Sequence, residues 1–146
     1  MKKIFGIIVL GLLWCTASYS NIIMQDLIDA LVDTNKPKSI KVVNSLKAID
    51  NNDKSYDLVI RKANLDINDA KNIASTIKKI QQNNGPKLHT ISMSFNENLK
   101  DEGIITLLNH LPLTTLVIAF VECGIIDEAG QAIIDWSTKT NNLNGI

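Results

Sequence analysis

Residues 88–103 read LHTISMSFNENLKDEG, and they join a short alternating segment to the start of a helix. Ile91 and Met93 are apolar and two residues apart, which is the spacing along one face of a β-strand. After Gly103 the apolar spacing changes to three and four residues, which predicts a helix ending before Pro112. The apolar positions of that helix are Ile104, Leu107, Leu108 and Leu111. The stretch therefore predicts one strand followed by one helix.

The same strand-and-helix pattern occurs three times along the chain. Residues 58–61 and 116–120 also predict short strands, and residues 73–80 and 129–136 predict the helices that follow them. Short strands that alternate with helices favour parallel strands joined by helical crossovers. We therefore predict an α/β fold with a parallel sheet.

The three cycles also match one another residue by residue, so an internal repeat is expected. Five residues of the second cycle recur 27 positions later: Ile91, Met93, Asn96, Leu99 and Gly103 correspond to Ile118, Phe120, Cys123, Ile126 and Gly130. The first cycle fits with one extra residue, since Leu58 and Ile60 precede their counterparts by 33 positions, whereas Asn64, Ile67 and Lys71 precede theirs by 32. The alignment predicts two rows of stacked core side chains, and it places Asn64, Asn96 and Cys123 at the bends after the strands.

These repeated motifs resemble leucine-rich repeats of the longer, helix-containing type typified by ribonuclease inhibitor. The resemblance covers residues 56–140 and is carried mainly by residues 88–103 and 126–130. It implies a short solenoid of three repeats over residues 56–146, with parallel strands on one face and helices on the other. Two predicted helices in residues 21–55 would form a helical N-terminal cap. The alternative is a single α/β domain with an open parallel sheet.

The resemblance also implies where a partner binds, because the strand face away from the helices is the usual binding surface of that family. The residues predicted to point outward there are Val59, Arg61, Ser92, Ser94, Val117, Ala119 and Val121. Valines on a solvated sheet face are unusual and favour a contact surface. We therefore expect a non-catalytic module that binds an unidentified protein through this face.

A different class of function remains open beside that expectation. Open parallel sheets place ligand sites at the carboxyl ends of their strands, so the alternative is a small enzyme or solute-binding domain. The polar groups available at that edge would be Arg61, Asn64, Asn96, Glu122 and Cys123. Convergence of these groups on one point would favour the alternative.

The first residues carry the basic, apolar and small-residue regions of a secretory signal peptide. Two lysines precede an uncharged apolar run over residues 4–14, and Ser18 and Ser20 follow it. The run is shorter than the roughly 20 residues that a membrane-spanning helix needs. We expect residues 1–20 to be removed, leaving a secreted or periplasmic protein without a permanent membrane anchor. A lipoprotein acylated at Cys15 is the alternative.

Composition and spacing argue against several other classes of function. The formal net charge of the chain is zero, which is untypical of a general nucleic-acid or polybasic membrane binder. His89 and His110 have no further His or Cys at metal-ligand spacing, and no glycine-rich phosphate loop is present. We expect no catalytic residue, cofactor or metal. Cys123 would be the sole cysteine after cleavage, and we expect it to be buried.

Acidic residues recur at the predicted helix starts: Asp66, Asp69, Asp101, Glu102, Asp127 and Glu128. A carboxylate there accepts hydrogen bonds from free backbone N–H groups and complements the helix dipole. We therefore interpret these residues as structural caps rather than paired catalytic carboxylates.

Overall fold

The computed structural model describes residues 24–49, 53–140 and 143–146, so the expected signal peptide over residues 1–20 lies outside the described part. Three parallel strands form a sheet in the sequential order β1 (Ser55–Val59), β2 (Lys87–Ser92) and β3 (Val117–Ala119). Helices α3 (Ile67–Gln82), α4 (Lys100–Leu108) and α5 (Glu128–Lys139) follow these strands in turn. The protein is therefore an α/β fold with a three-stranded parallel sheet.

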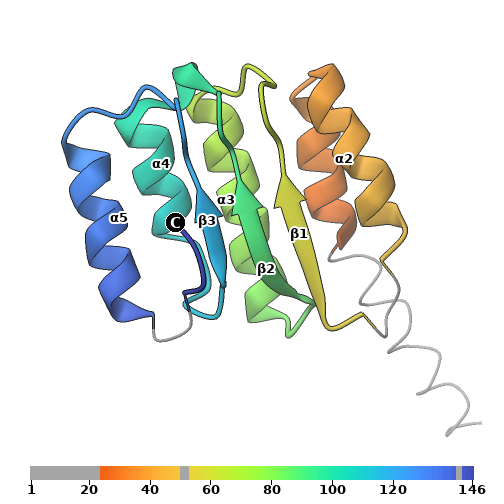
Figure 1. Ribbon diagram of the computed structural model, residues 1–146. Coiled ribbons are helices and arrows are strands. Elements are labelled where there is room, and N and C mark those ends of the chain that lie inside the picture. Colours follow the sequence, from red (N-terminus) through yellow and green to blue (C-terminus); the bar gives the residue numbers. More distant parts are fainter. Residues whose placement is uncertain (1–23, 50–52, 141–142) are drawn as a thin grey trace, which may run out of the picture.

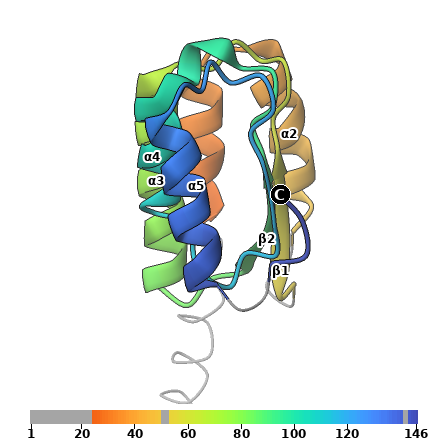
Figure 2. The same ribbon diagram turned by 60° about the vertical axis from the view of Figure 1, so that its left-hand side comes forward.

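The helices that follow the strands, α3, α4 and α5, lie on one face of the sheet (Figures 1 and 2). Two further helices precede β1, one over residues 24–33 and α2 (Pro37–Lys47), as expected for residues 21–55. Helix α2 lies beside β1 at one end of the sheet, and α5 lies at the opposite end (Figure 1). This arrangement fits a single α/β domain.

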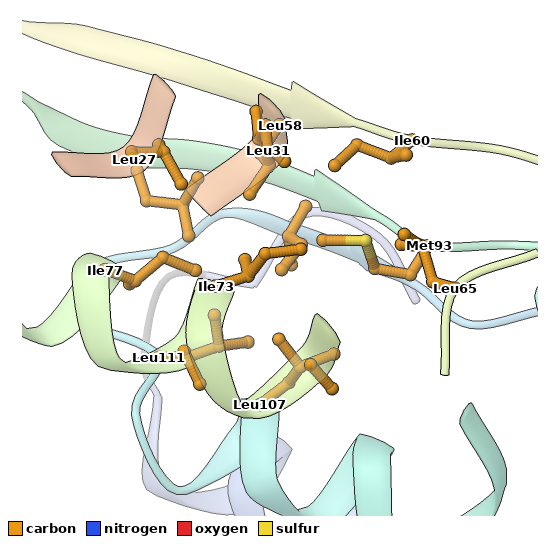
Figure 3. Packing of buried hydrophobic residues seen from close by; sticks show 14 of the residues in the cluster. Leu27, Leu31, Leu58, Ile60, Leu65, Ile73, Ile77, Met93, Leu107 and Leu111 are labelled. Carbon is orange, nitrogen blue, oxygen red and sulfur yellow. The ribbon is translucent and has the colours of Figure 1, made fainter. Parts of the chain in front are cut away.

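The two predicted rows of core side chains are confirmed by the register of the sheet. Leu58 pairs with Ile91, which in turn pairs with Ile118, and all three are fully buried. Beyond the strand ends the ladder continues, because the Met93 N–H donates to the Ala119 carbonyl at 2.9 Å. Leu58 and Met93 point into the core shared with the helices (Figure 3). Burying both rows contributes on the order of 10 kcal/mol before the entropic cost of folding.

Helix α3 shows why the predicted caps matter. The Asp66 carboxylate accepts hydrogen bonds from the backbone N–H groups of Asn68 at 2.8 Å and Asp69 at 3.1 Å. In return the Asp69 carboxylate accepts from the Asp66 N–H at 3.0 Å, which completes a capping box. Lys36 forms an ion pair with Asp69 and thereby ties the N-terminal helices to the first cycle. The structural role predicted for Asp66 and Asp69 is confirmed.

The last cycle departs from the predicted alignment. Leu99 is fully buried, whereas Ile126, its expected counterpart, is 79% exposed. The reason lies in the connection to the helix: a 3-10 turn (Glu97–Leu99) leads directly into α4, whereas α5 starts only after Asp127. The alignment of Ile126 with Leu99 is therefore wrong. Ile125 packs against the core instead.

The free edge of β3 is covered by the C-terminal segment. Val117 forms a bridge with Gly145, and the Asn144 N–H donates to the Leu116 carbonyl at 2.7 Å. The Ile118 N–H donates to the Gly145 carbonyl at 3.2 Å. This pairing satisfies backbone groups that an edge strand would otherwise leave open.

Candidate protein-binding face

The sheet surface that faces away from α3, α4 and α5 is called the outer face here. Because strand side chains alternate, residues next to the buried rows point to this side. Its residues are Asp57, Val59, Arg61, Thr90, Ser92, Ser94, Val117, Ala119 and Val121. The register places Val59 beside Ser92, and Ser92 beside Ala119. All seven predicted site residues therefore lie on one face.

Exposure differs sharply across the outer face. Val59 and Val121 are 43% and 57% exposed, and Arg61 is also exposed. Ser92 and Ser94, in contrast, are 8% and 2% exposed. The expectation that both serines present their side chains to a partner is therefore wrong.

The serines are buried because they belong to the central strand of the sheet and its continuation. The Ser94 hydroxyl accepts a hydrogen bond from the Val121 N–H at 3.3 Å, so it also joins two neighbouring chain segments. Val117 and Ala119 are half-buried, and the C-terminal segment lies next to Val117. The outer face thus has a floor of small side chains between the more exposed Val59 and Val121.

Phe95 lies at the end of this face and was not among the predicted residues. The Arg61 guanidinium lies 5.1 Å from the centre of its ring, and the Lys62 ammonium lies 4.7 Å from it. Both are cation–π distances. Among the described residues, no acidic side chain lies within salt-bridge distance of Arg61 or Lys62. Two positive charges are therefore held at one end of the outer face.

An uncommon backbone conformation accompanies the cluster of Arg61, Lys62 and Phe95. Lys62, Phe95 and Glu122 all have positive φ, at 55°, 63° and 51°. They are separated by the same 33 and 27 positions as the core rows, so they occupy one equivalent place in the three cycles. Side chains other than glycine and asparagine adopt this conformation infrequently. The repeat offsets of 33 and 27 residues could have identified Phe95 as the counterpart of Lys62 and Glu122. Apolar spacing alone does not report the backbone φ at these positions.

The bend after β2 is organised by Asn96, which is fully buried. Its side-chain oxygen accepts from the N–H groups of Ala63 at 2.9 Å and Leu65 at 3.1 Å. Its amide nitrogen donates to the carbonyls of Ile60 at 2.8 Å and Met93 at 2.6 Å. Both polar atoms of Asn96 are therefore engaged by backbone, as the structural interpretation of this position requires.

The position predicted for Asn64 is wrong. Asn64 is exposed, with φ of 60°, and its side chain accepts a hydrogen bond from the Asn98 amide at 2.8 Å. Ala63 lies in the buried place instead, because the first cycle keeps its offset of 33 through the bend. Asparagine tolerates the left-handed conformation better than most residues, which suits it to the exposed turn.

Cys123 occupies the corresponding place in the third cycle. Its thiol is 1% exposed and donates to the Met93 carbonyl at 3.2 Å. Burial raises the pKa of the Cys123 thiol, which disfavours the reactive thiolate. The expected burial of Cys123 is confirmed.

Some of the polar groups considered for a ligand site at the strand ends lie in buried bends, and the others lie in the exposed turn. These groups therefore do not converge on one point.

The carboxylate that caps α5 comes from the preceding cycle. Asp101 accepts hydrogen bonds from the backbone N–H groups of Ile126 at 2.8 Å and Glu128 at 3.2 Å. Asp127, the residue before α5, makes no side-chain cap. The structural role of Asp101 is confirmed, but it stabilises the next helix rather than its own, and the capping role predicted for Asp127 is wrong.

At the opposite end of the outer face, His89 is the additional residue of a bulge in β2 and lies 3.2 Å from the Asp57 carboxylate.

Within residues 24–49, 53–140 and 143–146, no group of three or more His, Cys, Asp or Glu side chains could hold a metal ion. The same residues contain no helix long and apolar enough to cross a membrane. Comparison of the chain with known family models, curated proteins and solved structures finds no match.

Proposed function

We propose that this chain is an exported, non-catalytic module of the leucine-rich-repeat type that binds a protein through its outer face. The observation that carries the proposal is that α3, α4 and α5 all lie on the other side of the sheet (Figure 2). Val59, Val121 and Arg61 remain exposed on the side that these helices leave open.

Three features support the repeat type. Equivalent core residues lie in register across the sheet, as Leu58, Ile91 and Ile118 do. The positive φ values recur at one place in each cycle. Asn96 satisfies the backbone of two neighbouring bends at once, which couples one cycle to the next. Coupling between neighbours is what stabilises a stack of units that cannot each bury both faces.

The chemistry of the outer face supports protein binding. Its floor of Ser92, Ser94 and Ala119 has no long side chains, so another protein surface can approach the sheet closely. Val59 and Val121 add exposed apolar area on either side of that floor. Arg61, held against Phe95, supplies the residue type that interfaces favour. A partner with apolar side chains and an acidic group near Arg61 complements this surface.

Export rests on the basic start, the apolar run of residues 4–14 and the small residues Ser18 and Ser20. An exported protein meets its partner in the envelope or the medium, so these are the places to search. Intact mass of the recovered protein tests this part directly, because cleavage before Asn21 removes the first 20 residues. A measured mass that includes Met1, or one that shows a lipid on Cys15, contradicts cleavage before Asn21.

The binding proposal is tested with the double variant Val59→Glu and Val121→Glu. Both positions are exposed, so the fold should remain intact, while each carboxylate would lose its hydration in the complex. Partner retained from native envelope and medium fractions should fall by about tenfold or more. A matched control carries Val32→Glu and Leu113→Glu, two residues that are each 47% exposed away from the outer face. Equal retention by the test and control variants contradicts the proposal.

A further inference from the structure

The two ends of the molecule carry helix surfaces that complement one another. Helix α2 lies at the β1 end of the sheet and α5 at the β3 end (Figure 1). We propose that copies of this chain associate head to tail, with α5 of one copy packed against α2 of the next. This contact does not involve the outer face, so it is independent of the proposed function.

The exposed surface of α5 carries one isoleucine and two carboxylates, and Lys139 lies in the last turn of the helix. Ile134 is 56% exposed, on the side of α5 that faces away from the buried Ala129 and Trp136. Asp127 precedes it by seven residues and lies on the same side, since seven residues make about two helical turns. Asp135 follows Ile134 directly and is exposed. The surface therefore presents one isoleucine between carboxylates.

Helix α2 carries the opposite charge seven residues from its own exposed isoleucine. Ile40 is 42% exposed, and Lys47 follows it by seven residues on the same side. Lys38 and Lys41 are exposed on either side of Ile40, and the sequence of α2 contains no acidic residue. This surface therefore presents one isoleucine among lysines.

Antiparallel packing brings the two layouts into register. When Ile134 of one copy lies on Ile40 of the next, Asp127 lies opposite Lys47, because each is seven residues from its isoleucine in opposite chain directions. Both spacings correspond to about 10 Å along a helix. In the described part of the chain, neither Asp127 nor Lys47 has an ion-pair partner of its own. The pairing between copies satisfies both charges.

Each contact uses α5 of one copy and α2 of the other. A growing assembly therefore keeps one unused α2 at one end and one unused α5 at the other end. Such heterologous contacts generate a ring when the rotation closes and an open chain when it does not. The formal net charge is zero for the whole chain and −2 after removal of residues 1–20, which take Lys2 and Lys3 with them, so charge repulsion between copies is small. The average mass should therefore rise with protein concentration and fall with salt.

Two charge reversals test the contact without removing the fold. Asp127→Lys places lysine opposite Lys47, and Lys47→Asp places aspartate opposite Asp127, so each variant alone should associate about tenfold more weakly than the original protein. In an equimolar mixture, each variant's α5 meets an α2 of opposite charge on the other variant, so association should return. Sedimentation velocity at low salt measures all four samples.

The controls separate this contact from general charge effects and from association through the apolar N-terminal run. Lys78→Asp, which changes an exposed lysine on α3, should leave the association unchanged. Ile134→Glu should abolish the association, while the far-ultraviolet circular dichroism spectrum of this variant should match that of the original protein. The N-terminal run is the same in all variants, so only the proposed contact predicts rescue by mixing. A monomer at every concentration, or a mixture that associates no better than its components, overturns the proposal.

Discussion

The second and third cycles share a sequence pattern but differ in how much of it they bury. In the second cycle Asn96, Leu99 and Gly103 are all buried. In the third, Cys123 is buried while Ile126 is exposed. In the second cycle the 3-10 turn leads directly into α4, whereas in the third cycle α5 starts only after Asp127. The same residue spacing therefore buries its apolar residue after the bend only where the helix follows the turn at once.

The bends give the largest expected difference between the two cycles. Asn96→Ala removes four hydrogen bonds and leaves buried backbone groups in two bends without partners, so we expect a loss of about 3–5 kcal/mol in the free energy of unfolding. Cys123→Ala removes a weak donor and a small volume, and should cost about 1 kcal/mol. Urea denaturation of both variants measures the difference. Equal losses would show that Asn96 does not hold the bends together.

The residues after the bends extend the comparison. Leu99→Ala empties a fully buried site and should cost about 3 kcal/mol. Ile126→Ala changes a side chain that is 79% exposed, and its effect should stay within about 0.5 kcal/mol. Thermal or urea unfolding at low protein concentration, where copies do not associate, measures both. A large loss for Ile126→Ala would restore the original alignment of the two cycles.

Apolar spacing was sufficient to predict the order of the strands and helices and the core rows, because a buried row needs only a repeat of two residues and a buried helix side a repeat of three or four. The bounds differ, since the first strand covers Ser55–Val59 rather than residues 58–61. It could not place the first bend, where Ala63 rather than Asn64 is buried. That choice depends on backbone φ, which spacing does not report.

The outer face was predicted in position but not in exposure. Ser92 and Ser94 are covered by neighbouring segments that lie far away in sequence, so their burial follows from the assembled sheet. Phe95 is held in place by tertiary contacts with Arg61 and Lys62. Burial of a small residue and stacking of a cation are both properties of three-dimensional neighbours rather than of local sequence.

Helix starts provide the smallest expected effect. Asp66 caps α3 from within its own cycle, whereas α5 is capped by Asp101 of the preceding cycle and Asp127 is uninvolved. Asp66→Ala should therefore cost about 1 kcal/mol at neutral pH, and Asp127→Ala only a few tenths, through the helix dipole.

The effect of Asp66 should also depend on pH. The Asp69 N–H, followed by the charge of Lys36, lowers the pKa of the Asp66 carboxyl below its usual value. A carboxyl whose pKa is lowered by folding stabilises the protein at any pH above its unfolded value, and that stabilisation is lost as the pH falls through the folded value. The difference between the original protein and Asp66→Ala should therefore be constant near neutrality and shrink in acid. Urea midpoints across an acid series measure it, with Asp127→Ala as the control, whose effect is already only a few tenths of a kcal/mol at neutral pH. A difference that persists undiminished into acid would mean that Asp66 acts through hydrogen bonds that its neutral form retains.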